Sequence, residues 1–234
     1  MQLFYDPDLE DTTRTFTFPA QESKHLVRVL RKGPGDRIHI TNGRGDLFQA
    51  EILRADPGNC SAQIVSHTKS LPKGFRLHLA VAPTKMNDRY EWMLEKATEI
   101  GLDEISPIVC QHSERRTIKA DRMEKVLQAA MKQSQQTHLP RLHPLCSFQE
   151  FLERDFPGLK FIAHCQAGDR EELKRVARAD TDITVLIGPE GDFSPEEVDL
   201  ARAKGFVPIS LGHNRLRTET AAILACATIN TINY

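Results

Sequence analysis

The N-terminal part of the chain, up to Pro72, alternates apolar and polar positions in short runs. Glycine-rich turn sequences such as Gly33–Asp36 and Asn42–Asp46 separate these runs. Alternation with a period of two predicts β-strands. The predicted strands are Arg14–Phe18, Arg37–Thr41, Leu47–Leu53 and Cys60–His67. We therefore expect a small β-barrel or sandwich, interrupted by one short helix at Gln21–Leu30, where the apolar residues have helical spacing.

A different rhythm follows the sequence Leu71–Gly74, which we interpret as a linker. Apolar runs of strand length now alternate with segments long enough for helices. Met86–Ile100 repeats its apolar residues every three or four positions, and Gly101 follows as a typical helix stop. The predicted strands are Leu77–Ala82, Ile105–Val109, Lys160–His164, Ile183–Ile187 and Phe206–Leu211. Strands joined through helices pair in parallel, so we expect a β domain at residues 1–72 and an α/β domain at residues 73–234.

Overall charge excludes a protein that binds nucleic acid through bulk positive charge. The 234 residues carry 31 Lys and Arg against 32 Asp and Glu, a net charge of -1. Two local basic sets remain, at residues 24–37 and 115–122. Each can be an ordinary solvated surface, but together they favour a phosphate-rich partner. The candidate RNA-binding residues are Lys24, His25, Arg28, Arg31, Arg115 and Arg116.

Cysteine and histidine usage predicts neither disulfides nor a metal site. The five cysteines are scattered and form no C-x-x-C pair. The spacings of His112, His138, His143 and His164 match no common ligand pattern. The acidic N-terminal sequence lacks the features of a signal peptide, and the most apolar run, Ala221–Ile229, is too short to span a bilayer. We expect reduced thiols, a cytoplasmic location, no metal and no membrane partner.

Two glycine-containing loops follow predicted strands of the second domain. Gly188–Phe193 comes directly after the strand Ile183–Ile187 and leads into a capping box at Ser194–Glu197. The stretch Ser210–Ala221 comes after the next strand and leads into a predicted helix at Ala221–Ile229. Ligands in open parallel sheets bind beyond the carboxyl ends of strands, so the two loops predict a ligand crevice. The alternatives are a plain tight turn in the first loop and, in the second, a helix cap at Thr218 with Arg217 in an ion pair with Glu219 or Glu190.

The loop sequences IGPEGDFSPEE (187–197) and SLGHNRLRTETAAI (210–223) resemble the cofactor loops of knotted, SPOUT-type RNA methyltransferases. The similarity is to the family that methylates uridine N3 in 16S ribosomal RNA. It extends to four further segments and so to essentially the whole chain. These are HLVRVLRKGPGD (25–36), KMNDRYEWMLEKATEIGLDEISPI (85–108), SERR (113–116) and KQSQQTHLP (132–140).

The resemblance implies a fold, a cofactor and an assembly. The fold is a PUA-like β-barrel followed by an α/β SPOUT domain whose C-terminus forms a deep trefoil knot, an exception to the rule that folds avoid knots. The cofactor is S-adenosylmethionine, and a homodimer completes its cleft. By position, the cofactor-binding residues are Ile187, Gly188, Pro189, Gly191, Leu211, Gly212, Leu216, Arg217 and Thr218.

The reaction implied is methylation of N3 of one uridine in 16S ribosomal RNA, uridine 1498 in the family's naming, with the assembled small subunit as substrate. The N3 proton must leave, and the base must be turned out of any stack. Arg217 is the candidate that stabilises the uracil anion. Glu190 is the candidate base, although a glutamate in such a loop equally suits a structural role. Trp92 and Phe193 could stack on a base, and packing is favoured for Trp92.

Three single positions and one short stretch depart from the family pattern. Asp192 stands where glycine is common, and His213–Arg215 replaces a more usual Pro-Arg-Ile. Lys132 and Gln136 replace a glutamate and an arginine, which questions one contact to RNA or to the second subunit. The alternative functions are a non-catalytic RNA-binding module, a SPOUT enzyme for another rRNA or tRNA nucleotide, and a nicotinamide-dependent Rossmann enzyme. The Rossmann alternative is disfavoured because this chain lacks the G-x-G-x-x-G sequence of such enzymes.

Overall fold

A computed structural model describes residues 2–166 and 168–234 of the chain. The chain forms two compact units, and each is described here by itself. Of the described residues, the first unit contains 2–72 and 131–139, and the second contains 73–130, 140–166 and 168–234. Residues 131–139 therefore group with the first unit, whereas the sequence analysis places them in the second domain.

The first unit is built on a five-stranded sheet with the order β1-β3-β4-β5-β2. β1 and β3 are parallel, and the other neighbours are antiparallel. Side chains of β4 alternate between buried and half-buried along most of its length, as expected of a strand with one face on a core. The strands are β1 (Leu3–Tyr5), β2 (Thr15–Thr17), β3 (Arg37–Thr41), β4 (Asp46–Arg54) and β5 (Ser61–Lys69).

The predicted short helix of the first unit is a pair of helical turns. α1 (Ala20–Lys24) continues directly into a π-helical turn, His25–Val29. Leu26 of this turn is fully buried, in the same core cluster as Ile40 and Phe48, whereas Val29 is 64% exposed. The apolar spacing identifies the buried face, and the basic residues lie on the outer side.

Residues 131–139 join the first unit through backbone and side-chain hydrogen bonds. The Thr41 hydroxyl donates to the carbonyl of Thr137 at 3.1 Å, and the same carbonyl accepts from the Gly45 N–H at 2.9 Å. Leu139 N–H donates to the Gly43 carbonyl at 2.9 Å. These bonds link residues distant in sequence, which explains why no local pattern predicts them.

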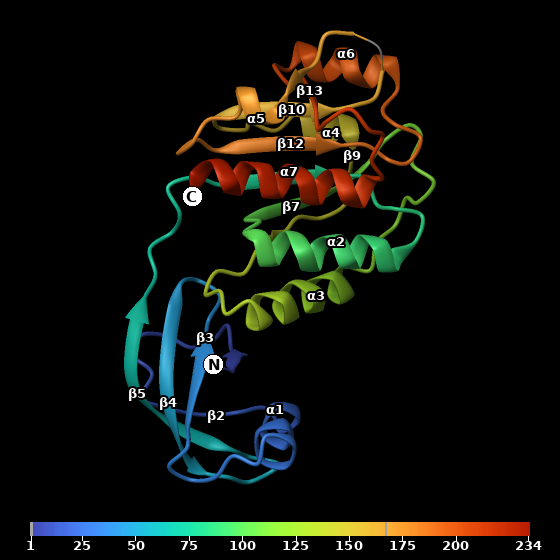
Figure 1. The fold of residues 1–234 in the computed structure, drawn as a ribbon. Coiled ribbons are helices and arrows are strands. Elements are labelled where there is room, and N and C mark those ends of the chain that lie inside the picture. Colours follow the sequence, from blue (N-terminus) through green and yellow to red (C-terminus); the bar gives the residue numbers. More distant parts are fainter. Residues whose placement is uncertain (1, 167) are drawn as a thin grey trace. The chain divides into compact units, whose positions relative to one another are not determined.

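The second unit is a parallel sheet with the order β11-β13-β10-β12-β6-β7-β8, and β9 also pairs with β7 (Figure 1). β6 and β12 are completely buried, as is usual in a sheet covered on both faces. The strands are β6 (Leu77–Val81), β7 (Glu104–Val109), β8 (Arg141–Leu142), β9 (Cys146–Ser147), β10 (Leu159–Ala163), β11 (Glu171–Glu172), β12 (Ile183–Ile187) and β13 (Val207–Ser210).

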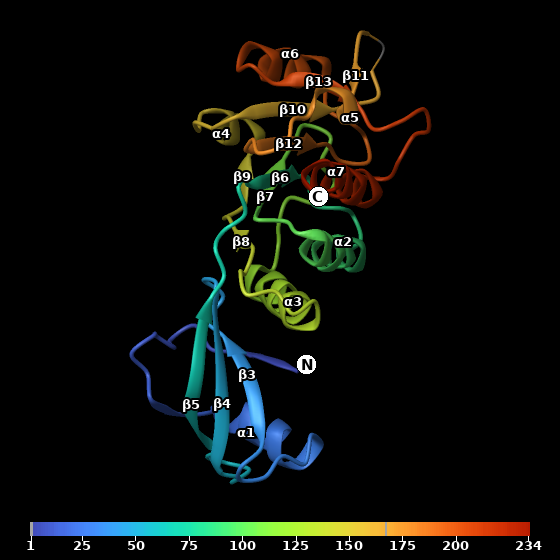
Figure 2. The ribbon, with the colours of Figure 1, turned by 60° about the vertical axis from the view of Figure 1, so that its left-hand side comes forward.

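Helices cover both faces of this sheet. α2 (Asn87–Ile100) and α7 (Thr218–Asn233) lie on one face and pack against each other. α4 (Phe148–Leu152) and α6 (Pro195–Ala203) lie on the other face (Figure 2). A cluster of buried side chains from α4, α6 and the sheet fills that second face. The remaining helices are α3 (Ala120–Gln133) and α5 (Leu173–Val176).

The predicted helix boundaries near the loops are confirmed. α2 ends at Ile100, and Gly101 caps it with a φ of +121°, which residues with a Cβ atom rarely adopt. α6 begins with the capping box of Ser194 and Glu197, and Pro195 is its first residue. Within the described residues, every helix is too short or too polar to cross a membrane.

Candidate functional site

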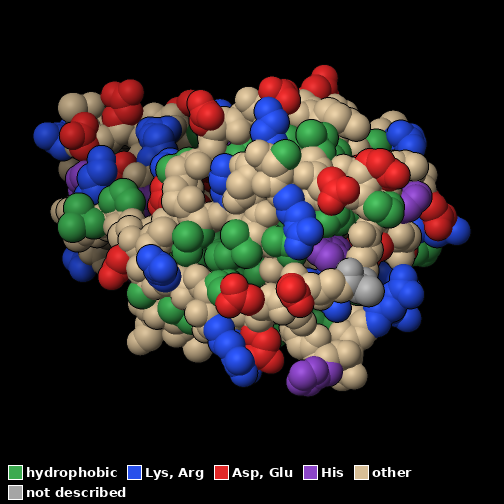
Figure 3. Space-filling view, turned by 90° about the horizontal axis from the view of Figure 1, so that it is seen from above, with side chains coloured by type: hydrophobic (Ala, Val, Ile, Leu, Met, Phe, Trp, Pro, Cys, Tyr) green, Lys and Arg blue, Asp and Glu red, His purple; other side chains and the backbone are tan. Residues whose placement is uncertain are grey.

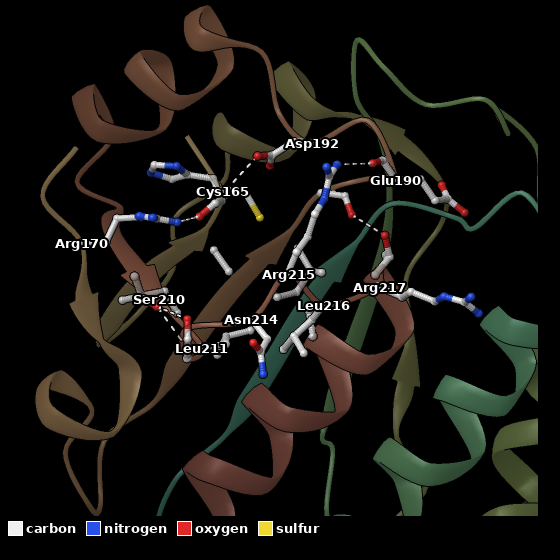
Figure 4. A pocket seen from close by; sticks show the side chains of 18 of the residues that line it. Cys165, Arg170, Glu190, Asp192, Ser210, Leu211, Asn214, Arg215, Leu216 and Arg217 are labelled. Carbon is white, nitrogen blue, oxygen red and sulfur yellow. Dashed lines mark hydrogen bonds between the residues drawn. The ribbon is translucent and has the colours of Figure 1, made fainter. Parts of the chain in front are cut away.

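The two predicted loops line one cavity of about 630 Å³ at the carboxyl ends of β10, β12 and β13 (Figure 4). This volume falls in the range typical of small-molecule sites. Of the nine predicted cofactor-binding residues, all except Gly191 line the cavity. Residues after β10 form a further wall that the sequence analysis did not include. They are His164, Cys165 and Arg170.

Thr218 connects the two loops. Its buried hydroxyl donates to the carbonyl of Gly188 at 3.0 Å, across thirty positions of sequence. The N-cap of α7 is Arg217, which makes no side-chain cap. Capping by Thr218, one of the alternatives from sequence, is therefore wrong. Its hydroxyl instead holds the start of α7 against the end of β12.

Each of the three loop glycines has a reason within the protein's own structure. A Cβ atom on Gly188 would lie 3.1 Å from the Phe193 ring and 3.3 Å from the Phe193 nitrogen. A Cβ on Gly191 would lie 2.9 Å from Cβ of His112. Gly212 has open space around it, but its φ is +131°. Glycine is therefore favoured by packing at Gly188 and Gly191 and by backbone conformation at Gly212.

Asp192 bonds to two neighbouring segments. Its φ is +64°, which explains why glycine suits this position and why aspartate, a residue that tolerates left-handed backbone, can replace it. The carboxylate accepts from the N–H groups of Cys165 at 2.8 Å and Phe193 at 2.9 Å. The Asp192 carbonyl lies 3.0 Å from Nδ1 of His112. Aspartate at position 192, where the family more commonly has glycine, therefore adds side-chain hydrogen bonds that hold the loop.

Glu190 takes part in holding the loop. Its Oε1 accepts the backbone N–H of Lys85 at 3.0 Å, which ties the loop to the segment before α2. Its carbonyl accepts from the Arg215 guanidinium at 3.3 Å. Both contacts agree with the structural alternative that the sequence left open for Glu190.

Arg215 and Arg217 are both exposed, but they leave the second loop in different directions (Figure 4). Arg215 reaches across the cavity to Glu190. Among the described residues, Arg217 forms no ion pair with Glu190 or Glu219, and Glu219 lies 3.9 Å from Arg89 instead. The ion pair considered for Arg217 is thus absent there, and its guanidinium stays available to a ligand.

His164 is a cavity residue that the sequence analysis discounted. It is 8% exposed, and neither ring nitrogen has a hydrogen-bond partner within the described residues. Burial lowers the pKa of His164, so the ring is neutral near pH 7. Its position in the sequence could have identified it as a cavity residue. His164 ends a predicted strand, and the ends of parallel strands lie at the same sheet edge as the two loops.

The two basic sets differ in how their charges are used. In the first unit, Lys24, His25 and Arg28 line a second cavity of about 350 Å³, and Arg31 is exposed beyond the π-helical turn. In the second unit, Arg115 and Arg116 donate to main-chain carbonyls, those of Thr84, Lys85 and Gln111. On the face shown in Figure 3, acidic and basic side chains are intermixed. The first set is the freer one for phosphate contacts.

Of the two aromatic candidates, Phe193 is buried and Trp92 is exposed. Phe193 is 2% exposed and packs against Phe148, with ring centroids 5.4 Å apart. Trp92 is 48% exposed on α2. The packing favoured for Trp92 is therefore wrong, and Phe193 supports the loop from inside.

Two protein families match the chain. One, described as an RNA methyltransferase domain, matches residues 71–230. The other, described as an RNA methyltransferase PUA domain, matches residues 18–65. The first match covers the large sheet and both cavity loops, and the second lies within the five-stranded unit.

Individual relatives match over most of their length. The ribosomal RNA small subunit methyltransferase E of Rickettsia conorii is 31% identical over 209 residues, which cover 88% of this chain and 85% of that protein. A probable rRNA methyltransferase from Porphyromonas gingivalis has a crystal structure with 41% identity and a TM-score of 0.92, covering 100% and 98% of the two chains. The Neisseria gonorrhoeae methyltransferase E, solved with bound S-adenosylmethionine, has 25% identity and a TM-score of 0.89, covering 100% and 98%.

Proposed function

Because this chain belongs to the RNA methyltransferase family and is an S-adenosylmethionine-dependent rRNA methyltransferase, we propose that it methylates N3 of one uridine in 16S ribosomal RNA. The observation that carries the proposal is the pair of loops joined by Thr218 and Gly188 around one cavity. The proposed uridine is the one numbered 1498 in the family's naming. A methyltransferase for another rRNA or tRNA nucleotide is the alternative.

The cavity residues suit S-adenosylmethionine. Ile187, Leu211 and Leu216 supply apolar walls for an aromatic base. Backbone groups of the two strand-end loops supply donors and acceptors, because such groups near Gly212 carry no side chain over them. Gly191 does not line the cavity, and we propose that it acts indirectly, by packing on His112. When bound, the cofactor supplies a methyl group on a positively charged sulfur.

Arg217 is the proposed electrostatic catalyst. Uracil carries negative charge at N3 only after the proton has left, so a nearby guanidinium stabilises the transition state more than the ground state. The Arg217 side chain is exposed at the start of α7, beside the cavity. We propose that Glu190, whose carboxylate already accepts the Lys85 N–H, orders the loop first and is the weaker candidate for the base.

RNA phosphates are proposed to contact Lys24, His25, Arg28 and Arg31 of the first unit. These side chains surround a cavity or lie on the surface, and contacts of this type position RNA with little base discrimination. Arg115 and Arg116 contribute less directly, because their hydrogen bonds to carbonyls shape the segment near Lys85. The proposed substrate form is the assembled small subunit.

We also propose a knotted homodimer, as the family resemblance implies. Supporting it, apolar side chains are exposed on two helices that pack together, with Trp92 on α2 at 48% and Leu224 on α7 at 37%. A second subunit seated on these helices would remove both side chains from water, which is favourable for apolar surface. Light scattering of the purified protein measures the subunit number directly.

Calorimetry and product analysis test the proposal. We expect S-adenosylhomocysteine to bind with one site per chain and NAD to show no binding. Nucleoside analysis of treated small subunits is expected to give N3-methyluridine. Binding of NAD alone would favour the Rossmann alternative, binding of neither would favour the RNA-binding module, and a different methylated nucleoside would assign another target.

A further inference from the structure

A second cavity of the large unit, of about 290 Å³, lies at the sheet edge opposite the candidate cofactor cavity. His78, the second residue of β6, and Glu104, the first residue of β7, line it. His143, just after β8, completes the group. All three stand at the amino ends of parallel strands or beside them, whereas the cofactor loops follow carboxyl ends.

These three side chains form one compact cluster. His78 and Glu104 are register partners on adjacent strands. Nε2 of His143 lies 2.6 Å from Oε2 of Glu104, and the two imidazole rings stack with centroids 5.2 Å apart. One nitrogen or oxygen atom from each residue lies within 4.8 Å of the others.

We propose that His78, Glu104 and His143 bind a divalent transition metal ion, for which Zn²⁺ is the best match. Two imidazoles and one carboxylate are a donor set that zinc accepts, with bonds of about 2.0 to 2.2 Å. In a tetrahedral zinc site, donors at these bond lengths are about 3.3 to 3.6 Å apart. Donor atoms that now lie within 4.8 Å of one another would therefore have to approach by up to roughly an ångström, through rotation of the side chains.

The surroundings prepare the cluster for an ion. Oγ of Ser106 lies 2.9 Å from Nε2 of His78, and such a second contact orients a ligating ring and leaves its other nitrogen for the metal. Among the described residues, no hydrogen bond engages Nδ1 of His78. The ion would take the place of the hydrogen bond between Nε2 of His143 and Oε2 of Glu104, with the imidazole bound as a neutral ligand and the glutamate as a carboxylate.

Three arginines, Arg76, Arg141 and Arg154, line the same cavity, and their positive charge opposes a cation there. Arg76, which is 4.0 Å from Oε1 of Glu104, is neutralised by two hydrogen bonds to the Asp182 carboxylate, at 2.9 and 3.2 Å. The Arg154 guanidinium lies 5.6 Å from the centre of the Phe151 ring. Since arginines line the same cavity, an inorganic anion is the competing ligand that an experiment must distinguish.

Bound metal would link three segments that are far apart in sequence, namely the starts of β6 and β7 and the residue after β8. A ligand that binds only the folded state raises the melting temperature. The site is therefore proposed as a structural one, separate from methyl transfer. No metal site was predicted from the sequence because that prediction used the spacing of nearby histidines and cysteines. The three residues of this cluster are far apart in sequence and meet only when the strands pair.

Zinc titration of the full-length, chelator-treated protein tests the proposal. Calorimetry with Zn²⁺ is expected to show one site per chain, and the melting temperature should rise with added Zn²⁺. His143→Asn and Glu104→Gln should each lower zinc affinity at least tenfold. Loss of even a residue that only supports a ligand typically lowers metal affinity by about ten- to a hundredfold. Ser106→Ala is a milder variant that keeps all three ligands and should weaken binding less.

His67→Gln is the matched control, because His67 pairs with Asp46 at 2.9 Å in the other unit but is not part of the three-residue cluster. Its zinc affinity should equal that of the parent. Circular dichroism establishes that each variant is folded. Equal zinc binding by the parent and by folded His143→Asn and Glu104→Gln would overturn the proposal. Stabilisation by inorganic phosphate with none by Zn²⁺ would overturn it too, and would assign the cavity to an anion.

Discussion

The hydroxyl of Thr218 donates to the carbonyl of Gly188 at 3.0 Å, so the first residue of α7 is bonded to the first residue after β12. Both residues are buried, and both line the candidate cofactor cavity. This bond fixes the separation of the two loops. Methyl transfer depends on alignment of the reacting atoms, so the bond bears directly on activity.

Thr218→Val should test this bond, because valine keeps the shape of threonine and removes the hydroxyl. A buried carbonyl without its donor costs about 1 to 3 kcal/mol. We expect S-adenosylmethionine affinity to fall roughly fivefold or more, since about 1.4 kcal/mol corresponds to a factor of ten. Thr228→Val is the control, because its exposed hydroxyl bonds only within α7, to the Leu224 carbonyl. Calorimetry that shows equal affinity for both variants would remove the bond from the account.

Gly212→Ala should weaken cofactor binding through the backbone. A residue with a Cβ atom at φ of +131° costs roughly 1 to 3 kcal/mol, although the added atom meets open space. The loop is then expected to relax away from the conformation that lines the cavity. Gly33→Ala, also in open space but without a positive φ, is the matched control. Melting temperature and cofactor titration should show a binding defect in Gly212→Ala alone.

Acid should destabilise the first unit through Asp46. Burial raises the pKa of Asp46, but hydrogen bonds from Asn42 and His67 and the charge of Lys69 outweigh burial, so the pKa lies below its ordinary value of 3.8. A depressed carboxyl pKa contributes stability above the unfolded value, and this contribution is lost as pH falls through the folded one. Urea unfolding from pH 6 to pH 3 should show a smaller loss of stability in Asp46→Asn than in the parent. Parallel curves would contradict the prediction.

Arg217→Ala should lower turnover far more than cofactor affinity. Removing one electrostatic donor typically costs two to three orders of magnitude in rate, and uracil needs that donor only once N3 has lost its proton. Single-turnover methylation together with cofactor titration separates the two effects. Arg215→Ala is the comparison, since Arg215 already bonds the Glu190 carbonyl and is expected to affect the loop. A mutant that binds cofactor poorly but reacts normally at saturation would make Arg217 a binding residue.

Local sequence patterns predicted several of the helices and strands. The strand Ile183–Ile187 agrees residue for residue, and the capping box at Ser194 is present, because both depend on neighbours in sequence. β1 and β8 were missed because runs of three and two residues carry no periodicity. The similarity of the whole chain to the methyltransferase family is confirmed. The trefoil knot and the homodimer stay predictions.

Contacts between residues that are far apart in sequence could not be predicted from local patterns. Nothing local indicates that Thr218 bonds Gly188 or that His78 meets His143. The departure at Asp192 was visible, but its carboxylate bonds to Cys165 and Phe193 emerge only from the folded loop. The functional loops could be found from strand ends and glycines, whereas their mutual support depends on which strands become neighbours.

The most direct test of the central claim uses small ribosomal subunits that lack the modification, together with S-adenosylmethionine carrying an isotopically labelled methyl group. After reaction with the purified protein, mass spectrometry of nuclease fragments locates the label. We predict one methyl per 16S rRNA, at N3 of a single uridine, with Arg217→Ala far slower at saturating cofactor. Label at another nucleotide or at several sites, or no label despite measured cofactor binding, would contradict the account.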